Sequence, residues 1–145
     1  MEHVSSTLVM AATPVVADTH AIVWYLAQAK TLSAPAFLAI DSALLAGEPV
    51  YVSAISLIEL QYLVEHGRVP EHALRDLIAA SEDPEGTLTI IPVGTEIAEA
   101  LTTIPRHKIA DMPDRIVAAT AAFLDVPLVT ADQKIRQAGC IRTIW

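Results

Sequence analysis

Residues 15–28 read VVADTHAIVWYLAQ, and this stretch gives the first indication of the fold class of the chain. It opens on a short apolar run, residues 15–17, which predicts a buried strand. Residues 19–28 follow at once and predict a helix. Between the two stands Asp18, an acid at the point where a strand passes into a helix. A strand followed directly by a helix is the repeating unit of an α/β protein.

The rest of the chain repeats this alternation of short apolar runs and longer helical patterns. Ser33 is suited to cap the start of a helix, and Gly67 and Pro105 are suited to end one. Strands that are apolar without a clean two-residue period indicate a parallel sheet covered by helices on both faces. We therefore expect strands over residues 15–17, 49–52, 88–93, 127–130 and 141–144, and helices over residues 19–28, 34–46, 54–66, 70–81, 95–104, 113–124 and 132–138.

The length and composition predict a single domain. The chain has 145 residues, of which 53% are hydrophobic and 18% charged, so it is not a disordered acidic tail. We expect an N-terminal extension over residues 1–13, with Met10 as an alternative start, and one domain over residues 14–145. No stretch approaches the roughly 18 apolar residues of a membrane helix. The only cysteine, Cys140, leaves no intramolecular disulfide, so we expect a cytoplasmic protein with no membrane segment.

Several familiar catalytic motifs are missing from the sequence. It has no GxxxxGK[ST] phosphate loop, no HExxH zinc motif and no GxSxG nucleophile motif. The 5 glycines are not spaced for a dinucleotide fingerprint, and a single cysteine excludes thiolate zinc sites and CxxC redox chemistry. Carboxylates are the chemically useful side chains that remain.

Four acids stand just after predicted strands or near helix starts: Asp18, Glu59, Asp114 and Asp132. Because the strand-to-helix turns of a parallel sheet share one edge, the fold would bring these acids together. Clustered oxygen ligands suit Mg²⁺ or Mn²⁺. A metal held there lowers the pKa of a bound water and neutralises charge on a phosphoryl oxygen.

A simpler interpretation applies to three of these acids. Asp18, Asp114 and Asp132 could each be an ordinary acid at a helix N-terminus, where free N–H groups and the helix dipole stabilise it. Their shared edge is weak support for a site, because such caps lie on one edge in any parallel α/β domain.

Glu59 has its own alternative, because Ser56 stands three residues before it, as in a capping box. If the helix instead begins at Ser53, Glu59 lies too deep to cap it. It then falls on an apolar ridge between Ile55 and Leu63, with no Lys or Arg three or four residues away. An acid in that position is costly unless something such as a metal compensates its charge, so we favour a functional role for Glu59.

At these residues the sequence resembles the PIN-domain family, and within it the VapC-type toxins of bacterial toxin–antitoxin pairs. The likeness extends from about residue 14 to the C-terminus and rests on four segments in order. These are residues 17–20 (ADTH) with Trp24 and Leu26 following, residues 52–60 (VSAISLIEL), residues 114–121 (DRIVAATA) and residues 128–132 (LVTAD).

The resemblance implies a three-layer α/β/α fold with a parallel sheet and a Mg²⁺- or Mn²⁺-dependent ribonuclease. It makes Asp18, Glu59, Asp114 and Asp132 the acidic quartet of the catalytic and metal site. Three further residues would support the site: Thr130 as a hydroxyl that assists it, Asp111 as an acid for which helix capping is favoured, and Arg115 as a partner of a site acid or a phosphate. The implied partners are an RNA substrate, a second copy of the chain and an antitoxin that places a basic side chain against the acids.

Two other functions compete with this interpretation. One is a PIN-like interaction module without catalytic activity, against which the complete quartet counts. The other is an unrelated metal-dependent phosphatase on a similar fold. A haloacid-dehalogenase-type phosphatase needs a second Asp two places after its nucleophile, whereas His20 stands two places after Asp18.

The net charge of −8 argues against tight non-specific binding of nucleic acid, because 9 basic residues stand against 17 acidic ones. The charge is uneven, however. Residues 1–105 hold 3 basic and 13 acidic residues, whereas residues 106–145 hold 6 basic and 4 acidic ones. The basic residues therefore concentrate near Asp114 and Asp132, and we hypothesise a local RNA-facing surface that includes Lys134 and Arg136.

Overall fold

A parallel sheet forms the centre of the computed structural model, which describes residues 12–145. Most of the predicted extension over residues 1–13, with Met10, lies outside the described residues. The spatial order of the strands is β3-β2-β1-β4-β5, and every neighbouring pair is parallel, as expected. The strands are β1 (Val15–Ala17), β2 (Val50–Ser53), β3 (Leu88–Ile91), β4 (Leu128–Val129) and β5 (Thr143–Ile144).

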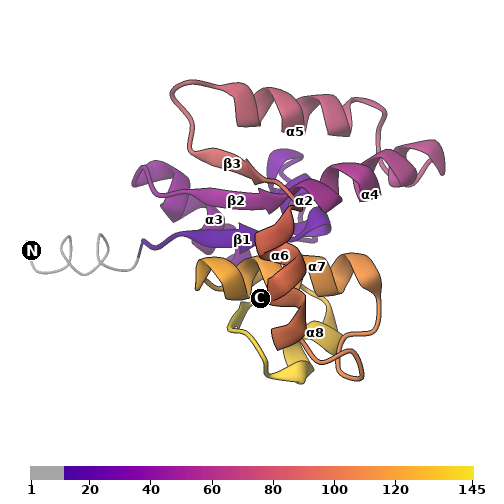
Figure 1. Cartoon of the computed structure of the whole chain (residues 1–145). Helices are drawn as coiled ribbons and strands as arrows, with labels where there is room; N and C mark the ends of the chain where they lie inside the picture. The colour runs from indigo at the N-terminus through magenta and orange to yellow at the C-terminus, as the bar shows by residue number, and fades with distance from the viewer. Residues whose placement is uncertain (1–11) are drawn as a thin grey trace, which may run out of the picture.

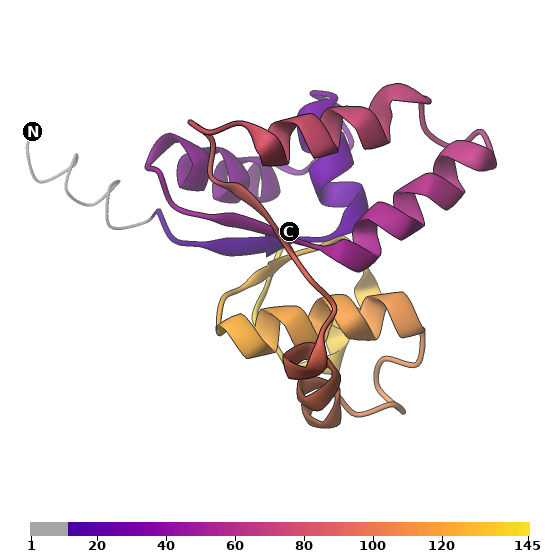
Figure 2. The same cartoon turned by 45° about the horizontal axis from the view of Figure 1, so that its top comes forward.

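Helices connect the strands and cover both faces of the sheet (Figures 1 and 2). In Figure 2, α2, α3 and α5 lie above the sheet, and α6 and α7 lie below it. The predicted α/β/α sandwich is therefore confirmed. The helices are α2 (Thr19–Leu26), α3 (Ala34–Leu45), α4 (Ala54–Glu65), α5 (His72–Glu82), α6 (Thr95–Ala100), α7 (Met112–Leu124) and α8 (Gln133–Ala138), with a 3₁₀ turn, η1 (Leu101–Thr103), after α6.

Two hydrophobic cores lie on opposite faces of the sheet. Val15 and Ala17 pack into the core between the sheet and helices α2 and α3. Val16, which stands between them in the sequence, packs into the core between the sheet and α7. All three side chains are buried. The strands lack an apolar–polar alternation because each of their faces meets a layer of helices.

The helix ends differ from the predicted ones at a few places. The predicted helix over residues 95–104 ends at Ala100 and tightens into η1, a common way to finish a last helical turn. The helix expected from residue 70 begins at His72. Within residues 12–145, no helix is long and apolar enough to cross a membrane.

Candidate active site

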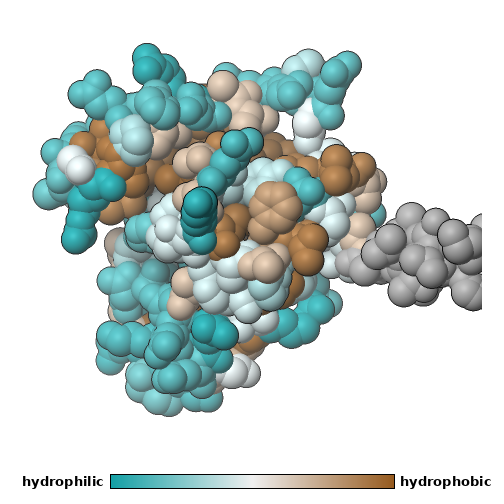
Figure 3. Space-filling view, turned by 180° about the vertical axis from the view of Figure 1, so that it is seen from behind, coloured by the Kyte–Doolittle hydropathy of each residue, from teal (hydrophilic) through white to brown (hydrophobic). Residues whose placement is uncertain are grey.

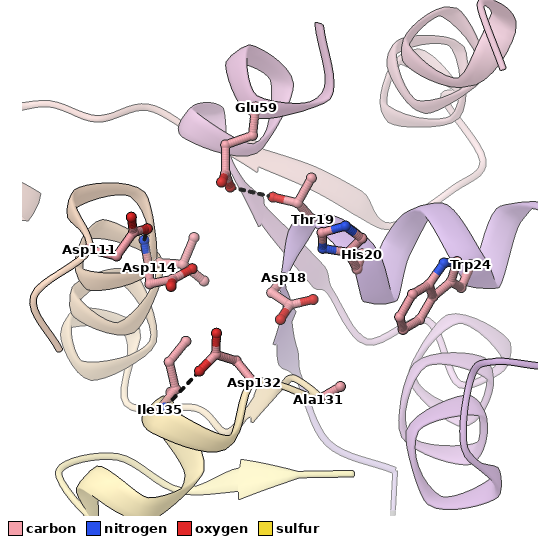
Figure 4. Close-up of a pocket in the computed structure, with 11 residues that line it drawn as sticks. Asp18, Thr19, His20, Trp24, Glu59, Asp111, Asp114, Ala131, Asp132 and Ile135 are labelled. Atoms are coloured by element: carbon pink, nitrogen blue, oxygen red, sulfur yellow. Dashed lines mark hydrogen bonds between the residues drawn. The ribbon is translucent and has the colours of Figure 1, made fainter. Parts of the chain in front are cut away.

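The four predicted acids line one cavity at the carboxyl ends of the central strands. Its volume is about 500 Å³, and Asp111 joins the quartet in its wall. Figure 4 shows Glu59, Asp114 and Asp132 around Asp18. The acids come from four places in the chain: the end of β1, the middle of α4, the start of α7 and the turn between β4 and α8. The sheet topology thus brings together residues that are far apart in the sequence.

Two of these acids cap helices while they line the cavity. Asp18 Oδ1 accepts a hydrogen bond from the backbone N–H of Ala21 at 2.9 Å, at the start of α2. Asp132 Oδ1 accepts a hydrogen bond from the backbone N–H of Ile135 at 3.1 Å, at the start of α8. The capping interpretation is therefore correct for both acids, and it does not exclude the functional one. Each cap holds its carboxylate at the edge of the cavity.

Asp111 is the N-cap of α7, as favoured from the sequence. Its Oδ2 accepts a long hydrogen bond, 3.4 Å, from the backbone N–H of Asp114. Asp114 lies in the first turn of the same helix, and both acids line the cavity. The first turn of α7 thus presents two carboxylates to one space.

The capping-box alternative for Glu59 is wrong. The N-cap of α4 is Ser53, whose Oγ accepts a hydrogen bond from the backbone N–H of Ile55 at 3.2 Å. Glu59 therefore lies in the second turn, too deep to cap the helix. The hydroxyl of Thr19 donates instead to Glu59 Oε1 at 2.7 Å, and the hydroxyl of Ser56 lies 2.8 Å from the same Thr19 oxygen.

Thr130 stands beneath the site, and Arg115 lies outside it. Thr130 is fully buried, and its Oγ1 accepts a hydrogen bond from the backbone N–H of Asp132 at 3.0 Å. Arg115 forms no ion pair with a site acid in the described part of the chain, contrary to expectation. Its guanidinium donates to the carbonyl oxygens of Ile104 and Leu101, both at 2.9 Å, at the end of η1. The Leu101 oxygen also accepts a hydrogen bond from the backbone N–H of Ile104, at 3.1 Å.

Burial and mutual repulsion raise the pKa values of three of the acids. For Asp18 the cause is burial, opposed in part by hydrogen bonds from Thr130 and from the backbone of Ala21. Burial also raises the pKa of Glu59, against the hydrogen bond from Thr19. The pKa of Asp114 rises to about 7 because of burial and the charges of neighbouring acids. No Lys or Arg is among the residues that line the cavity.

The donor set suits a hard divalent cation. Five carboxylates line the cavity, with no Lys or Arg among the described residues of its wall. The raised pKa values of Asp18, Glu59 and Asp114 come from burial together with repulsion by neighbouring acids. Among residues 12–145, no three acidic or histidine side chains converge closely enough to form a ready metal site. The carboxylates thus surround the space instead of meeting at one point. Oxygen ligands of this kind are the ones that Mg²⁺ and Mn²⁺ prefer.

The cavity wall also contains three polar or aromatic side chains that were not predicted as site residues: Thr19, His20 and Trp24. Thr19 is buried beside Glu59, a contact between positions 40 residues apart that no local pattern indicates. His20 is exposed, and the centre of its ring lies 5.4 Å from that of Trp24. The i, i+4 spacing of His20 and Trp24 on a helix was the one available signal that these two rings share a face.

Replacing Thr19 by valine is expected to lower the free energy of unfolding by about 1–3 kcal/mol. Thr19 is only 4% exposed, and the change removes the hydroxyl that contacts both Ser56 and Glu59. Urea denaturation measures the difference. Thr19→Ser retains the hydroxyl and is expected to stay closer to the wild type. Equal stabilities of the valine variant and the wild type would contradict a structural role for this hydroxyl.

A family model described as PIN domain matches residues 15–139, and the chain belongs to this family. Among its relatives is the ribonuclease VapC22 of Mycobacterium tuberculosis, which is 30% identical over 135 residues, 92% of this chain and 99% of the relative.

Solved structures share the fold. VapBC2 from Rickettsia felis, bound to a DNA fragment from its promoter, matches with a TM-score of 0.64 and 18% identity over 90% of this chain and 96% of that one. A toxin–antitoxin complex from Klebsiella pneumoniae matches with a TM-score of 0.51 and 20% identity over 83% of this chain and 88% of that one.

Proposed function

We propose that this protein is a metal-dependent ribonuclease, the toxin of a toxin–antitoxin pair, that hydrolyses RNA phosphodiester bonds. The observation that carries the proposal is one cavity lined by Asp18, Glu59, Asp114 and Asp132, with no Lys or Arg among the described residues of its wall. Membership of the PIN-domain family and the likeness to the ribonuclease VapC22 support the same activity.

The quartet would hold one or two Mg²⁺ ions, or Mn²⁺ in their place. Such an ion supplies an activated water and neutralises the charge that develops on the phosphate. The task of the protein is to hold its carboxylates in place, and the hydrogen bonds described above do this. The backbone N–H of Ala21 binds Asp18, and the backbone N–H of Ile135 binds Asp132. The hydroxyl of Thr19 binds Glu59. An acid that is not a direct ligand would orient the attacking water.

Cleavage of total RNA by the purified protein tests this function. We expect cleavage with Mg²⁺ or Mn²⁺ and none with a chelator, and mapping of the cut ends would identify the target. Metal binding without cleavage of any RNA would favour the inactive interaction module. Hydrolysis of a small phosphomonoester in the absence of RNA cleavage would favour the phosphatase.

An apolar groove between α2 and α3 suits a protein partner. The groove has a volume of about 660 Å³, and its large side chains include Trp24, Tyr25, Leu32, Phe37 and Leu38. Figure 3 shows the molecule from behind, the side of the sheet on which α3 lies, with apolar residues gathered between hydrophilic ones. We propose that an antitoxin packs here and sets a basic side chain against the acids, because the described wall of the acidic cavity contains no Lys or Arg.

Two further properties belong to the proposal. We expect a homodimer, from the family resemblance, and light scattering of the purified protein measures this. We also expect the protein to act in the cytoplasm, since its single cysteine, Cys140, forms no disulfide. The single PIN-like domain over residues 14–145 is proposed as the whole catalytic unit.

Replacing Lys134 and Arg136 together by glutamine is expected to weaken RNA binding and to flatten its dependence on salt. Both side chains are exposed on α8, the helix that Asp132 caps at the cavity edge. Loss of two phosphate contacts lowers the slope of log K against log salt by about 1.4 for single-stranded RNA. Fluorescence anisotropy of a labelled oligoribonucleotide at several salt concentrations measures the slope. An unchanged slope would place the RNA path elsewhere.

A further inference from the structure

A run of three basic side chains stands on the loop that leads into α7: Arg106, His107 and Lys108. All three are exposed, and residues 76–105 before them contain no Lys, Arg or His. We call residues 105–110 the basic loop. The next residue, Asp111, lines the acidic cavity. One short segment therefore carries a cluster of positive charge directly before an acid of the candidate active site.

The basic loop has a defined shape. Ile104, just before it, and Ile109, near its end, are buried in the core on the α7 side of the sheet and anchor it. Between them the backbone turns, and the N–H groups of Lys108 and Ile109 both donate to the carbonyl oxygen of Pro105, at 3.0 and 3.2 Å. The basic side chains thus stand on a fixed turn, which reduces the entropy lost when they bind a ligand.

Two contacts brace the basic loop against the helices that present acids to the cavity. Arg115 of α7 donates to the carbonyl oxygen of Ile104 at 2.9 Å, where the loop begins. Lys108 Nζ donates to the carbonyl oxygen of Ala138 at 3.3 Å, at the end of α8, the helix that Asp132 caps. An ammonium group has three donors, so this contact leaves two for a ligand.

The loop lies close to the acids along both of these connections. Lys108 precedes Asp111 by three residues, which span at most about 11 Å. The six residues of α8 separate Ala138, which Lys108 contacts, from Asp132 by about 9 Å. Both lengths are comparable with the Debye length of about 8 Å at physiological salt. Positive charge on the loop therefore acts on a strand that enters the acidic cavity.

We propose that the basic loop binds backbone phosphates of the RNA strand on one side of the bond that is cut. This inference rests on the ribonuclease function proposed above and names a part of the surface that holds the substrate. The acids repel RNA phosphates, and the described wall of their cavity contains no Lys or Arg. Cations outside the cavity attract the strand and leave the carboxylates free to hold a divalent ion.

The chemistry of the basic loop and its neighbours fits a phosphate backbone. An arginine binds a phosphate through two parallel N–H groups, and a lysine binds it as a point charge. The exposed Lys134 stands one helical turn before Ala138, on the same side of α8. Lys134 and Lys108 therefore follow one another along α8, from the end at Asp132 to the end at Ala138, as successive phosphates of one strand require.

A double variant, Arg106→Gln with Lys108→Gln, tests the inference. Its matched control is Arg68→Gln with Arg75→Gln, because all four side chains are exposed and both double variants change the net charge from −8 to −10. Arg68 follows α4 and Arg75 lies on α5, which covers the face of the sheet opposite to α7 (Figure 2). Circular dichroism and thermal melting show whether each variant is folded. We expect both to fold, since the changed side chains lie on the surface.

The first measurement is the salt dependence of RNA binding. Fluorescence anisotropy of a labelled oligoribonucleotide is recorded at several salt concentrations, with a chelator present so that the strand stays whole. For the loop variant the slope of log K against log salt is expected to fall by about 1.4, the value for two phosphate contacts on a single strand. The control is expected to keep the wild-type slope. An unchanged slope in the loop variant, or an equal fall in the control, would overturn the proposal.

The second measurement identifies the flank of the strand that the loop binds. Cleavage is followed on an oligoribonucleotide with one mapped cut site and on two shorter ones that lack the nucleotides on either side of it. In the wild type, removal of one flank is expected to raise KM on the order of tenfold, with a smaller effect on kcat. In the loop variant KM is expected to be raised already on the full strand, and removal of the same flank then changes it little.

Three outcomes would contradict these expectations in different ways. Wild-type cleavage with the same KM and the same dependence on both flanks in the loop variant would overturn the phosphate site alone. Absence of RNA cleavage by the wild type would instead contradict the ribonuclease function on which the inference rests. A change from dimer to monomer in the loop variant, seen by light scattering, would make the loop a contact between copies and overturn the proposal.

Discussion

Replacing Asp18 or Asp114 by asparagine is expected to lower Mg²⁺-dependent cleavage of RNA on the order of a hundredfold or more, since each change removes a charged oxygen ligand from the proposed metal site. Asparagine keeps the size of the side chain. In Asp18→Asn its oxygen can still accept the hydrogen bond from the backbone of Ala21 that begins α2. The loss would therefore be chemical and not a failure to fold.

Asp125→Asn is the matched control for these two variants. It removes one negative charge from a side chain that is 97% exposed at the end of α7, outside the acidic cavity. Asparagine also tolerates the left-handed backbone of this residue, where φ is 55°. Initial rates on a labelled oligoribonucleotide at saturating Mg²⁺ compare the variants. Full activity of both Asp18→Asn and Asp114→Asn would contradict the assignment of the four acids as the catalytic metal site.

The metal-free protein is expected to lose stability as the pH rises toward about 7, and divalent cations are expected to restore it. The pKa of Asp114 is about 7 in the folded protein, above its ordinary value of 3.8. Between these values the folded state holds more protons than the unfolded chain, so the contribution of Asp114 to the free energy of unfolding falls as the pH rises. The same ionisation creates the metal ligand.

The stabilisation by Mg²⁺ or Mn²⁺ should therefore be greater at pH 8 than at pH 5.5. At a free cation concentration of 100 times Kd, binding adds about 2.7 kcal/mol to the free energy of unfolding. Below pH 7 the cation must displace the proton of Asp114, which weakens binding about tenfold per pH unit for that one group. Thermal melts across this pH range, with the metal and with a chelator, measure both effects.

Asp114→Asn separates the loss of stability at high pH from the stabilisation by divalent cations. Without metal at pH 8, this variant is expected to melt at a higher temperature than the wild type, because one of several neighbouring acids has lost its charge. It should also show little stabilisation by cations. Asp125→Asn should respond to metal as the wild type does. Equal metal stabilisation of Asp114→Asn and the wild type would show that cations bind outside the acidic cavity.

Local sequence signals predicted most of the fold. Short apolar runs marked the strands and capping residues marked the helix starts, because both depend on neighbours within a few positions. Residues 15–17 and residues 34–45 show this well: one forms β1, and the other forms α3 with Ser33 as its N-cap. The end of α6 was predicted less well: the helix stops at Ala100 and tightens into η1. Arg115, more than ten residues away, binds the carbonyl oxygens of Leu101 and Ile104 there.

The sequence alone determined the parallel α/β architecture and the placement of Asp18, Glu59, Asp114 and Asp132 at one sheet edge. This was possible because the topology of a parallel sheet puts every strand-to-helix turn on the same side. The contacts of these acids are visible only in the tertiary structure: Thr19 holds Glu59, and Arg115 donates to carbonyl oxygens instead of pairing with an acid. The same is true of the burial that raises the pKa of Asp114. The contacts that brace the basic loop also appear only there. Such features depend on packing between distant segments, which local patterns do not encode.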